Sequence, residues 1–238
     1  MGDLYQKIAS IYDCCGISDF SVTFGKSILK YVQLLHPNEC FEKNIDICCG
    51  TGTLCGFFRD HGIETKGVDL SKEMLEVARK NYPDIEFAEC NAKDYQDDIL
   101  YDFATCTDDA LQHNTKVDDV KAIFKNVNRL LRPDGLFIFD INFVAYITLG
   151  ERIKFQQDQT ELLYNVSREG EIVTYVVNYY ENGNLIWSDA VKERDFSVDD
   201  ITILLKEAGF IVEMCSQYFF DEKNDKKWKI VARKVECI

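Results

Sequence analysis

A glycine-rich turn directly after a short apolar segment is the feature that most constrains how this chain folds. Residues 44–48 read Asn-Ile-Asp-Ile-Cys, and Gly50 and Gly52 follow before the next apolar stretch. Glycine adopts positive φ without strain and lets a ligand approach the backbone closely. A strand that leads through such a turn into a helix begins a βαβ unit, whose ligand lies beyond the carboxyl ends of the strands.

Strand and helix patterns alternate regularly after this turn. Strands are predicted at 44–48, 64–69, 85–88, 101–107 and 135–141, and helices at 54–61, 71–82 and 117–131. Ser71 is the expected N-cap of the second helix, and Pro133 is expected to stop the third. This alternation indicates parallel βαβ units that form a twisted sheet with helices on both faces.

The pattern differs on either side of this region. Residues 1–42 are predicted to be helical, with Tyr5, Ile8, Ala9 and Tyr12 spaced along one helix face and a second helix over about 21–35. Three runs with period-two alternation, 162–168, 172–181 and 185–196, are joined by Glu169-Gly170 and Asn182-Gly183, which are good hairpin turns. They predict an antiparallel β meander.

The chain closes with a helix and two strands. The helix is expected at 198–208, between the N-cap Ser197 and Gly209, and the strands at 211–220 and 227–235. We therefore expect three parts: an N-terminal helical cap (1–42), a Rossmann-like domain (43–144 and 197–238), and an inserted antiparallel β subdomain (145–196).

Charge and composition exclude some function classes. The 238 residues include 41 acidic and 27 basic side chains, a net charge of -14, which argues against nucleic-acid and anionic-membrane partners. The basic run 223–229 is expected to be a solvated turn. The start of the chain has no signal-peptide pattern and no apolar run approaches a membrane span, so we expect a cytoplasmic protein. Ten cysteines without a CxxC pair, and only three histidines, argue for reduced thiols and no metal site.

An acid at the end of the second strand indicates the kind of ligand. Asp69 can accept hydrogen bonds from two ribose hydroxyls, so together with the glycine turn it predicts an adenosine-containing ligand. A dinucleotide fingerprint needs a third glycine where Cys55 stands. Asp46, at the mouth of the turn, is a poor neighbour for a pyrophosphate and a good one for an amino group and a sulfonium.

Four segments in order resemble the motifs of the Rossmann-like (class I) S-adenosylmethionine-dependent methyltransferases. They are 46–52, 67–75, 90–94 and 130–137, and residues 5–13 are similar to the N-terminal helix of small-molecule methyltransferases. Cys48 replaces the first motif glycine, and Asn91 stands where the family usually has Asp. The resemblance implies a seven-stranded, mostly parallel sheet, with an insertion similar to that of the amino-sugar and glycine-type N-methyltransferases.

The resemblance also implies the cofactor, S-adenosyl-L-methionine, and the residues that hold it. Gly50 and Gly52 would admit the cofactor, Asp69 would bind the ribose, Asn91 would meet the adenine, and Asp46 would face the amino-acid end. The complete predicted cofactor set is Tyr5, Tyr12, Asp46, Cys48, Cys49, Gly50, Thr51, Gly52, Asp69, Leu70, Met74, Asn91, Ala92, Thr107 and Asp108.

Asp109 and His113 are the candidate catalytic residues, because they follow the fourth strand and are four positions apart. Either could orient or deprotonate an acceptor. In the alternative interpretation, Asp109 caps a helix and His113 is a hydrated surface residue. Other roles also stay open: Asp46 could tie down its loop, and Tyr5 and Tyr12 could be core aromatics.

These patterns favour transfer of a methyl group to a nitrogen or oxygen atom of a small-molecule acceptor, by a monomer or homodimer. A catalytic base is required only if the acceptor arrives protonated. The alternatives are a cofactor-binding module without turnover, a nicotinamide-dependent oxidoreductase, and an RNA or protein methyltransferase. Aromatic side chains of the meander could line the acceptor pocket, form a dimer face or pack within the sheet; they are Tyr179, Tyr180 and Trp187.

Overall fold

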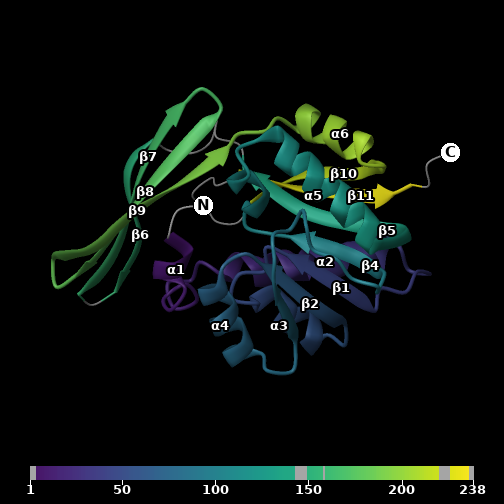
Figure 1. Cartoon of the computed structure of the whole chain (residues 1–238), viewed down its shortest axis with the longest axis horizontal. Helices are drawn as coiled ribbons and strands as arrows, with labels where there is room; N and C mark the ends of the chain where they lie inside the picture. Colours follow the sequence, from purple (N-terminus) through teal and green to yellow (C-terminus); the bar gives the residue numbers. More distant parts are fainter. Residues whose placement is uncertain (1–3, 143–148, 158, 220–225, 236–238) are drawn as a thin grey trace.

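The computed structural model describes residues 4–142, 149–157, 159–219 and 226–235, and it contains two sheets (Figure 1). The large sheet consists of β1 (Lys43–Ile47), β2 (Glu64–Asp69), β3 (Glu86–Glu89), β4 (Tyr101–Cys106), β5 (Leu131–Asn142), β10 (Phe210–Phe219) and β11 (Lys226–Lys234). The second sheet consists of β6 (Gly150–Gln157), β7 (Thr160–Glu169), β8 (Ile172–Glu181) and β9 (Asn184–Arg194).

The helices are α1 (Leu4–Ile8), α2 (Asp19–Leu35), α3 (Thr53–Asp60), α4 (Lys72–Asn81), α5 (Val117–Leu130), α6 (Val198–Glu207) and a short 3-10 helix, η1 (Ala110–His113). None of those described is both long enough and apolar enough to cross a membrane. Ser71 caps α4 by accepting a hydrogen bond from the backbone N–H of Met74, and Ser197 caps α6. Both caps confirm the predicted helix starts.

The large sheet has the strand order β10-β11-β5-β4-β1-β2-β3. Strands β1 to β5 are mutually parallel, whereas β11 is antiparallel to both β5 and β10. The order reverses between β1 and β4, and a ligand of such a sheet binds at the carboxyl ends of the strands beside this reversal. The predicted seven-stranded, mostly parallel sheet is therefore confirmed.

Helices cover both faces of this sheet. On one face, Phe24 of α2 and Phe58 of α3 pack against Phe103 of β4. On the other, Phe124 of α5 packs against Phe137 of β5, and α6 joins the same core. These rings are almost completely buried, and burial of each stabilises the fold by about 1.5–3 kcal/mol.

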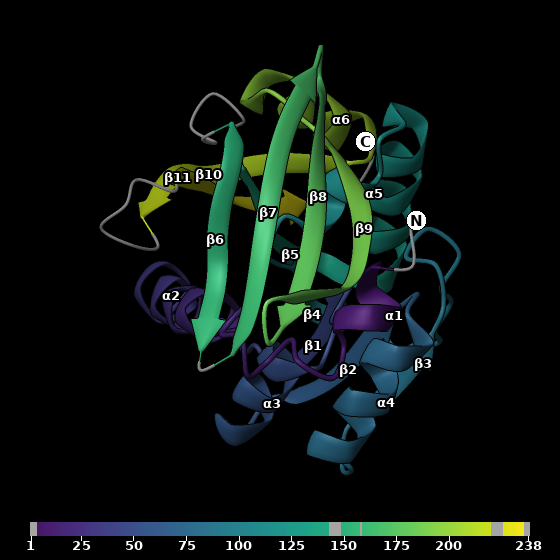
Figure 2. The same ribbon diagram turned by 90° about the vertical axis from the view of Figure 1, so that its left-hand side faces the viewer.

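Helix α1 lies between the second sheet and α4 (Figure 2). Its Leu4 and Ile8 are buried against Met74 of α4 and against Val173 and Val177 of β8. The amphipathic spacing predicted at the N-terminus thus has a packing partner, although the helix ends at Ile8 and Tyr12 lies in the turns that follow.

Some predicted boundaries were wrong. The inserted sheet has four strands where three were predicted, because β6 is an edge strand whose polar residues mask the alternation. Helix α5 ends at Leu130, and β5 begins at Leu131, before Pro133. The basic run 223–229 is not a solvated turn throughout: 220–225 lie outside the described residues, and Lys227 and Lys229 are buried in β11.

A single side chain joins the two ends of the insertion. Gln112, fully buried in η1, donates through Nε2 to the backbone oxygens of Asn142 (3.1 Å) and Arg194 (3.0 Å). Its Oε1 accepts from the backbone N–H of Asn142. Asn142 ends β5 and Arg194 ends β9, so Gln112 fixes where the inserted sheet leaves and rejoins the main domain.

We expect Gln112→Ala to reduce the free energy of unfolding by about 2–4 kcal/mol, since it leaves buried backbone groups without partners. Urea denaturation measures this difference. The control is Gln33→Ala, which removes an exposed side chain and should change the stability by less than about 0.5 kcal/mol. Equal effects of the two substitutions would contradict the role given to Gln112.

Candidate active site

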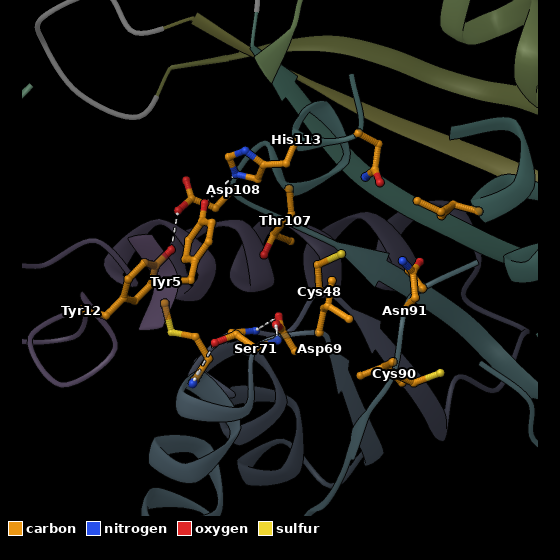
Figure 3. A pocket seen from close by; sticks show the side chains of 18 residues that line it. Tyr5, Tyr12, Cys48, Asp69, Ser71, Cys90, Asn91, Thr107, Asp108 and His113 are labelled. Carbon is orange, nitrogen blue, oxygen red and sulfur yellow. Dashed lines mark hydrogen bonds between the residues drawn. The ribbon is translucent and has the colours of Figure 1, made fainter. Parts of the chain in front are cut away.

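A cavity of about 750 Å³, including space open to solvent, lies at the carboxyl edge of the parallel strands (Figure 3). Loops after β1, β2, β3 and β4 contribute its wall. The lining residues are Tyr5, Tyr12, Cys48, Gly50, Val68, Asp69, Leu70, Ser71, Met74, Cys90, Asn91, Ala92, Thr107, Asp108, Ala110, His113, Asn114 and Ile123. The lining includes eleven of the fifteen predicted cofactor residues.

Asp69 holds the glycine turn in place. Its Oδ2 accepts from the N–H of Gly50 (2.9 Å), and its Oδ1 accepts from the N–H of Ser71 (2.8 Å). Burial raises the pKa of Asp69, and these backbone donors oppose the rise. Gly50 has φ +55°, and no atom lies within 4 Å of the place where a Cβ would stand, so its backbone borders open space.

Asp46 lies behind this wall and is not among the lining residues, so its contact with the cofactor stays a prediction. Its carboxyl is buried inside the sheet and accepts from the hydroxyl of Thr105 (2.6 Å) and the thiol of Cys55 (3.7 Å). Burial raises its pKa to about 7, whereas the two hydrogen bonds oppose the rise. Asp46 therefore joins β1 to β4 and α3.

Three other predicted contacts are also behind the lining. Cys49 is buried against Cys55, and the hydroxyl of Thr51 donates to Asp13 (2.7 Å). Gly52 has φ +76°, and a Cβ there would lie 2.7 Å from the ring of Phe87. Packing against Phe87 thus requires a glycine at position 52, whereas Gly50 is the position that opens onto the cavity.

A strained turn follows β4 at the far side of the cavity. Asp108 and Asp109 both have positive φ, 60° and 59°, which costs a non-glycine residue about 1–2 kcal/mol each. Their backbone N–H groups donate to the carboxylate of Asp140, at 2.7 Å and 3.1 Å. Lys227 offsets part of the negative charge, with its Nζ 2.8 Å from Asp108, 3.0 Å from Asp109 and 3.4 Å from Asp140.

Lys227 stays protonated in this cluster. Burial lowers its pKa, but the three surrounding carboxylates raise it by more, so the net shift is well above the ordinary value. Its Nζ also lies 3.9 Å from the centre of the Phe20 ring. Lys227 thereby connects β11 to the turn after β4 and to α2.

A second cavity adjoins the first and shares four lining residues with it: Tyr5, Tyr12, Asp108 and His113. The hydroxyl of Tyr5 is 2.6 Å from Nε2 of His113, and that of Tyr12 donates to Asp108 (3.1 Å), as Figure 3 shows. Tyr5 and Tyr12 thus form part of the boundary between the two cavities and are not only core aromatics.

Both candidate catalytic residues line the second cavity. Asp109 occupies the N-cap position of η1 but makes no capping hydrogen bond; instead it accepts from the side-chain amide of Asn142. His113 is not a hydrated surface residue, since its side chain is only 9% exposed. Burial lowers the pKa of His113, although Asp109 opposes this, so the imidazole is neutral at pH 7. The expected side-chain cap at Asp109 and the expected surface position of His113 are therefore wrong, whereas the catalytic roles of both residues stay predictions.

Three residues at or beside the second cavity were not predicted from the sequence: Asp140, Lys227 and Glu193. Glu193 of β9 lines the second cavity and is 7% exposed. The sequence contained a signal for Glu193. It shares the inward face of a strand with Val191, and a carboxylate is unusual on that face. Tyr179 and Trp187 stack on each other, with ring centres 5.3 Å apart, in a cluster with α1.

Comparison with known proteins agrees with this geometry. Residues 45–135 match a family model described as a methyltransferase domain. Within these residues the chain resembles a methyltransferase domain. Over the whole chain, a putative methyltransferase of Bacillus subtilis is 24% identical across 230 residues, which cover 92% of this chain and 91% of that protein.

Two solved structures share the fold of this chain. An S-adenosylmethionine-dependent methyltransferase from Clostridium acetobutylicum superposes with a TM-score of 0.73 at 21% identity, covering 90% of this chain and all of that one. An amino pentose methyltransferase from Micromonospora echinaspora, solved with S-adenosylmethionine bound, gives 0.75 at 15% identity and covers 90% and 92% of the two chains. Both neighbours have the class I fold seen here.

The packing role of Gly52 is testable by comparison with Gly62. Both have positive φ, but a Cβ at Gly62 would meet nothing within 4 Å. We expect Gly62→Ala to cost about 1–2 kcal/mol of stability from the backbone alone, and Gly52→Ala to cost about 1–3 kcal/mol more from overpacking against Phe87. Urea denaturation of both variants checks this; equal losses would disprove the packing explanation.

The pKa of Asp46 predicts a pH dependence of stability. The folded protein keeps the Asp46 proton up to about pH 7, whereas the unfolded chain releases it near the ordinary value of 3.8. Stability therefore falls as pH rises from about 4 to 7, by up to about 4 kcal/mol from this group. Asp46→Asn should abolish that decline when urea unfolding is measured at pH 5 and pH 8. The exposed control Asp98→Asn should keep it, and a wild-type slope in Asp46→Asn would refute the assignment.

Proposed function

We propose that this methyltransferase transfers a methyl group from S-adenosylmethionine to a nitrogen or oxygen atom of a small-molecule acceptor. The observation that carries the proposal is the pair of adjoining cavities. The first lies at the carboxyl edge of the sheet, behind the glycine turn, and the second shares part of its wall. One cavity would hold the cofactor and the other the acceptor.

The residues of the first cavity fit an adenosine-containing cofactor. Gly50 leaves room beside the backbone, and Asp69 presents a carboxylate at the end of β2 that can accept from ribose hydroxyls. Asn91 lines the cavity beside apolar Ala92 and Ile123, a suitable environment for a purine with an exocyclic amino group. The bound S-adenosylmethionine of the Micromonospora neighbour supports the same assignment.

When bound, S-adenosylmethionine supplies a methyl group on a positively charged sulfur, and the protein's contribution is to hold the acceptor in line with it. Correct alignment of two reactants can contribute about 7–11 kcal/mol to lowering the barrier. Tyr5 and Tyr12, from α1 and the turns after it, lie between the cavities and would restrict the acceptor's approach. Burial raises the pKa of both hydroxyls, so they remain hydrogen-bond donors.

The residues that bound the second cavity, together with the charge of the chain, favour a small acceptor. The cavity is bounded by residues of α1, β7, β8 and β9, among them Leu4, Tyr164, Tyr175 and Val191. A net charge of -14 also opposes a nucleic-acid acceptor. The neighbour from Micromonospora is named as an amino pentose methyltransferase, which supports a small-molecule acceptor for this chain.

Calorimetric titration with S-adenosylhomocysteine tests the cofactor site. We expect saturable binding to the wild type and weaker binding to Asp69→Asn, by about 1.5–3 kcal/mol for a lost hydrogen bond to a charged group, or roughly 10- to 150-fold. The control Asp98→Asn makes the same chemical change at an exposed position outside the cavity and should bind like the wild type.

Absence of binding to the wild type would overturn the proposal. Binding of a nicotinamide dinucleotide instead would favour an oxidoreductase. Binding of S-adenosylhomocysteine without methyl transfer to any of a broad panel of acceptors would indicate a cofactor-binding module without turnover.

A further inference from the structure

Three buried polar atoms converge on the second cavity without a hydrogen-bond partner among the described residues. They are Oδ1 of Asp109, Nδ1 of His113 and Oε2 of Glu193. A buried polar atom without a partner costs about 1–3 kcal/mol, so three in one cavity indicate groups that a ligand completes. His113 and Glu193 are neighbours here, with 3.9 Å between Nδ1 and Oε1.

The cavity also carries an excess of negative charge. Lys227 is its single lysine in the described lining, and its Nζ is already surrounded by Asp108, Asp109 and Asp140. His113 is neutral and adds no positive charge. The carboxyl of Glu193 therefore has no cation of its own, so its charged form becomes favourable in this buried position only when a cationic ligand lies beside it.

We propose that the second cavity receives an amine as a cation between Asp109 and Glu193, and that Glu193 takes up a proton from its nitrogen before methyl transfer. This inference rests on the proposed function and names the acceptor class of that site. Asp109 binds the acceptor, and Glu193 binds it and acts as the general base.

The number of hydrogen-bond donors favours an amine over an alcohol. A primary ammonium carries three N–H donors, and the cavity offers three unpartnered atoms. Two of these atoms, Oδ1 of Asp109 and Oε2 of Glu193, are carboxyl oxygens that can each accept from an ammonium. An alcohol has one donor and would leave one of the two oxygens buried and unpaired.

Atoms and charge are conserved in the proposed methyl transfer. One N–H proton of the ammonium passes to the carboxylate of Glu193, which frees the nitrogen's electron pair. The nitrogen then forms a bond to the methyl carbon as the carbon–sulfur bond breaks, and that bond's electrons remain on sulfur. The products are the methylated ammonium, S-adenosylhomocysteine and protonated Glu193, which afterwards returns its proton to solvent.

The environment of Glu193 suits proton transfer. Burial, followed by the charge of Asp109, raises its pKa to about 8, while Lys227 and a hydrogen bond from Tyr175 oppose the rise and Asp108 adds to it. A base whose pKa is close to the working pH is the most effective in general base catalysis. Glu193 is therefore protonated at pH 7 in the free protein and should ionise when an ammonium binds beside it.

The experiment compares two probes of equal size, cyclohexylamine and cyclohexanol, on protein saturated with S-adenosylhomocysteine. Saturation-transfer NMR titration at pH 7 should show the amine binding at least tenfold more tightly than the alcohol. Glu193→Gln should lose most of this preference. The matched control, Glu169→Gln, makes the same change at an exposed position of the same sheet and should retain it.

Proton release provides the second measurement. Titration of cyclohexylamine in two buffers of different ionisation enthalpy should show close to one proton released per amine bound at pH 7 by the wild type, and none by Glu193→Gln. Should Glu193→Gln fail to bind S-adenosylhomocysteine, Asp109→Asn takes its place in the preference test, and it should also lose the amine preference.

The outcomes separate the two proposals. If the wild type does not bind S-adenosylhomocysteine, the proposed function fails. The amine assignment alone is overturned if the wild type binds S-adenosylhomocysteine but binds neither probe or binds both equally well. It is also overturned if the preference for the amine persists in both Glu193→Gln and Asp109→Asn.

Discussion

The contact on which the site depends is the one between the carboxylate of Asp140 and the backbone of the turn after β4. Two consecutive aspartates hold left-handed conformations there, and each donates its backbone N–H to Asp140. Without those two hydrogen bonds the turn would lose the interactions that offset its strain. Asp140 is completely buried in β5, so burial raises its pKa, and the nearby ammonium of Lys227 opposes that rise. The hairpin of β10 and β11, to which Lys227 belongs, thus stabilises a turn that lies much earlier in the sequence.

That turn couples the two cavities. Asp108 faces both of them and accepts from Tyr12, whereas Asp109 faces only the second and is held there by Asn142. His113 follows within the same short helix and contacts Tyr5. A rigid turn with partners in α1 and at the end of β5 would fix the acceptor relative to the transferred methyl group. The inserted sheet adds β9 with Glu193 to this arrangement, and Gln112 holds the insertion where it leaves the domain.

The sequence predicted those features that depend on residues close together in the chain or on the common edge of parallel strands. Ser71 and Ser197 cap their helices because a cap needs only a neighbouring N–H, and Asp69 reaches the glycine turn because parallel strands end at a common edge. The partnership of Asp140 and Lys227 joins two strands far apart in the chain, and no spacing rule connects them. Glu193 lines the second cavity only because β9 lies beside it in the folded protein. The edge strand β6 was missed because its charged residues suit an exposed edge and also resemble a loop.

The glycine turn shows why a motif does not by itself identify its contacts. Gly50 and Gly52 are two positions apart and both have positive φ, yet they have different structural roles. Space beside Gly50 is open and available to a ligand, whereas the ring of Phe87 occupies the space beside Gly52. Asp46 belongs to the same motif and is directed into the sheet, where it joins strands. A glycine-rich motif therefore combines residues that meet the ligand with residues that hold the loop in position for it. Only the packing around each residue separates the two groups.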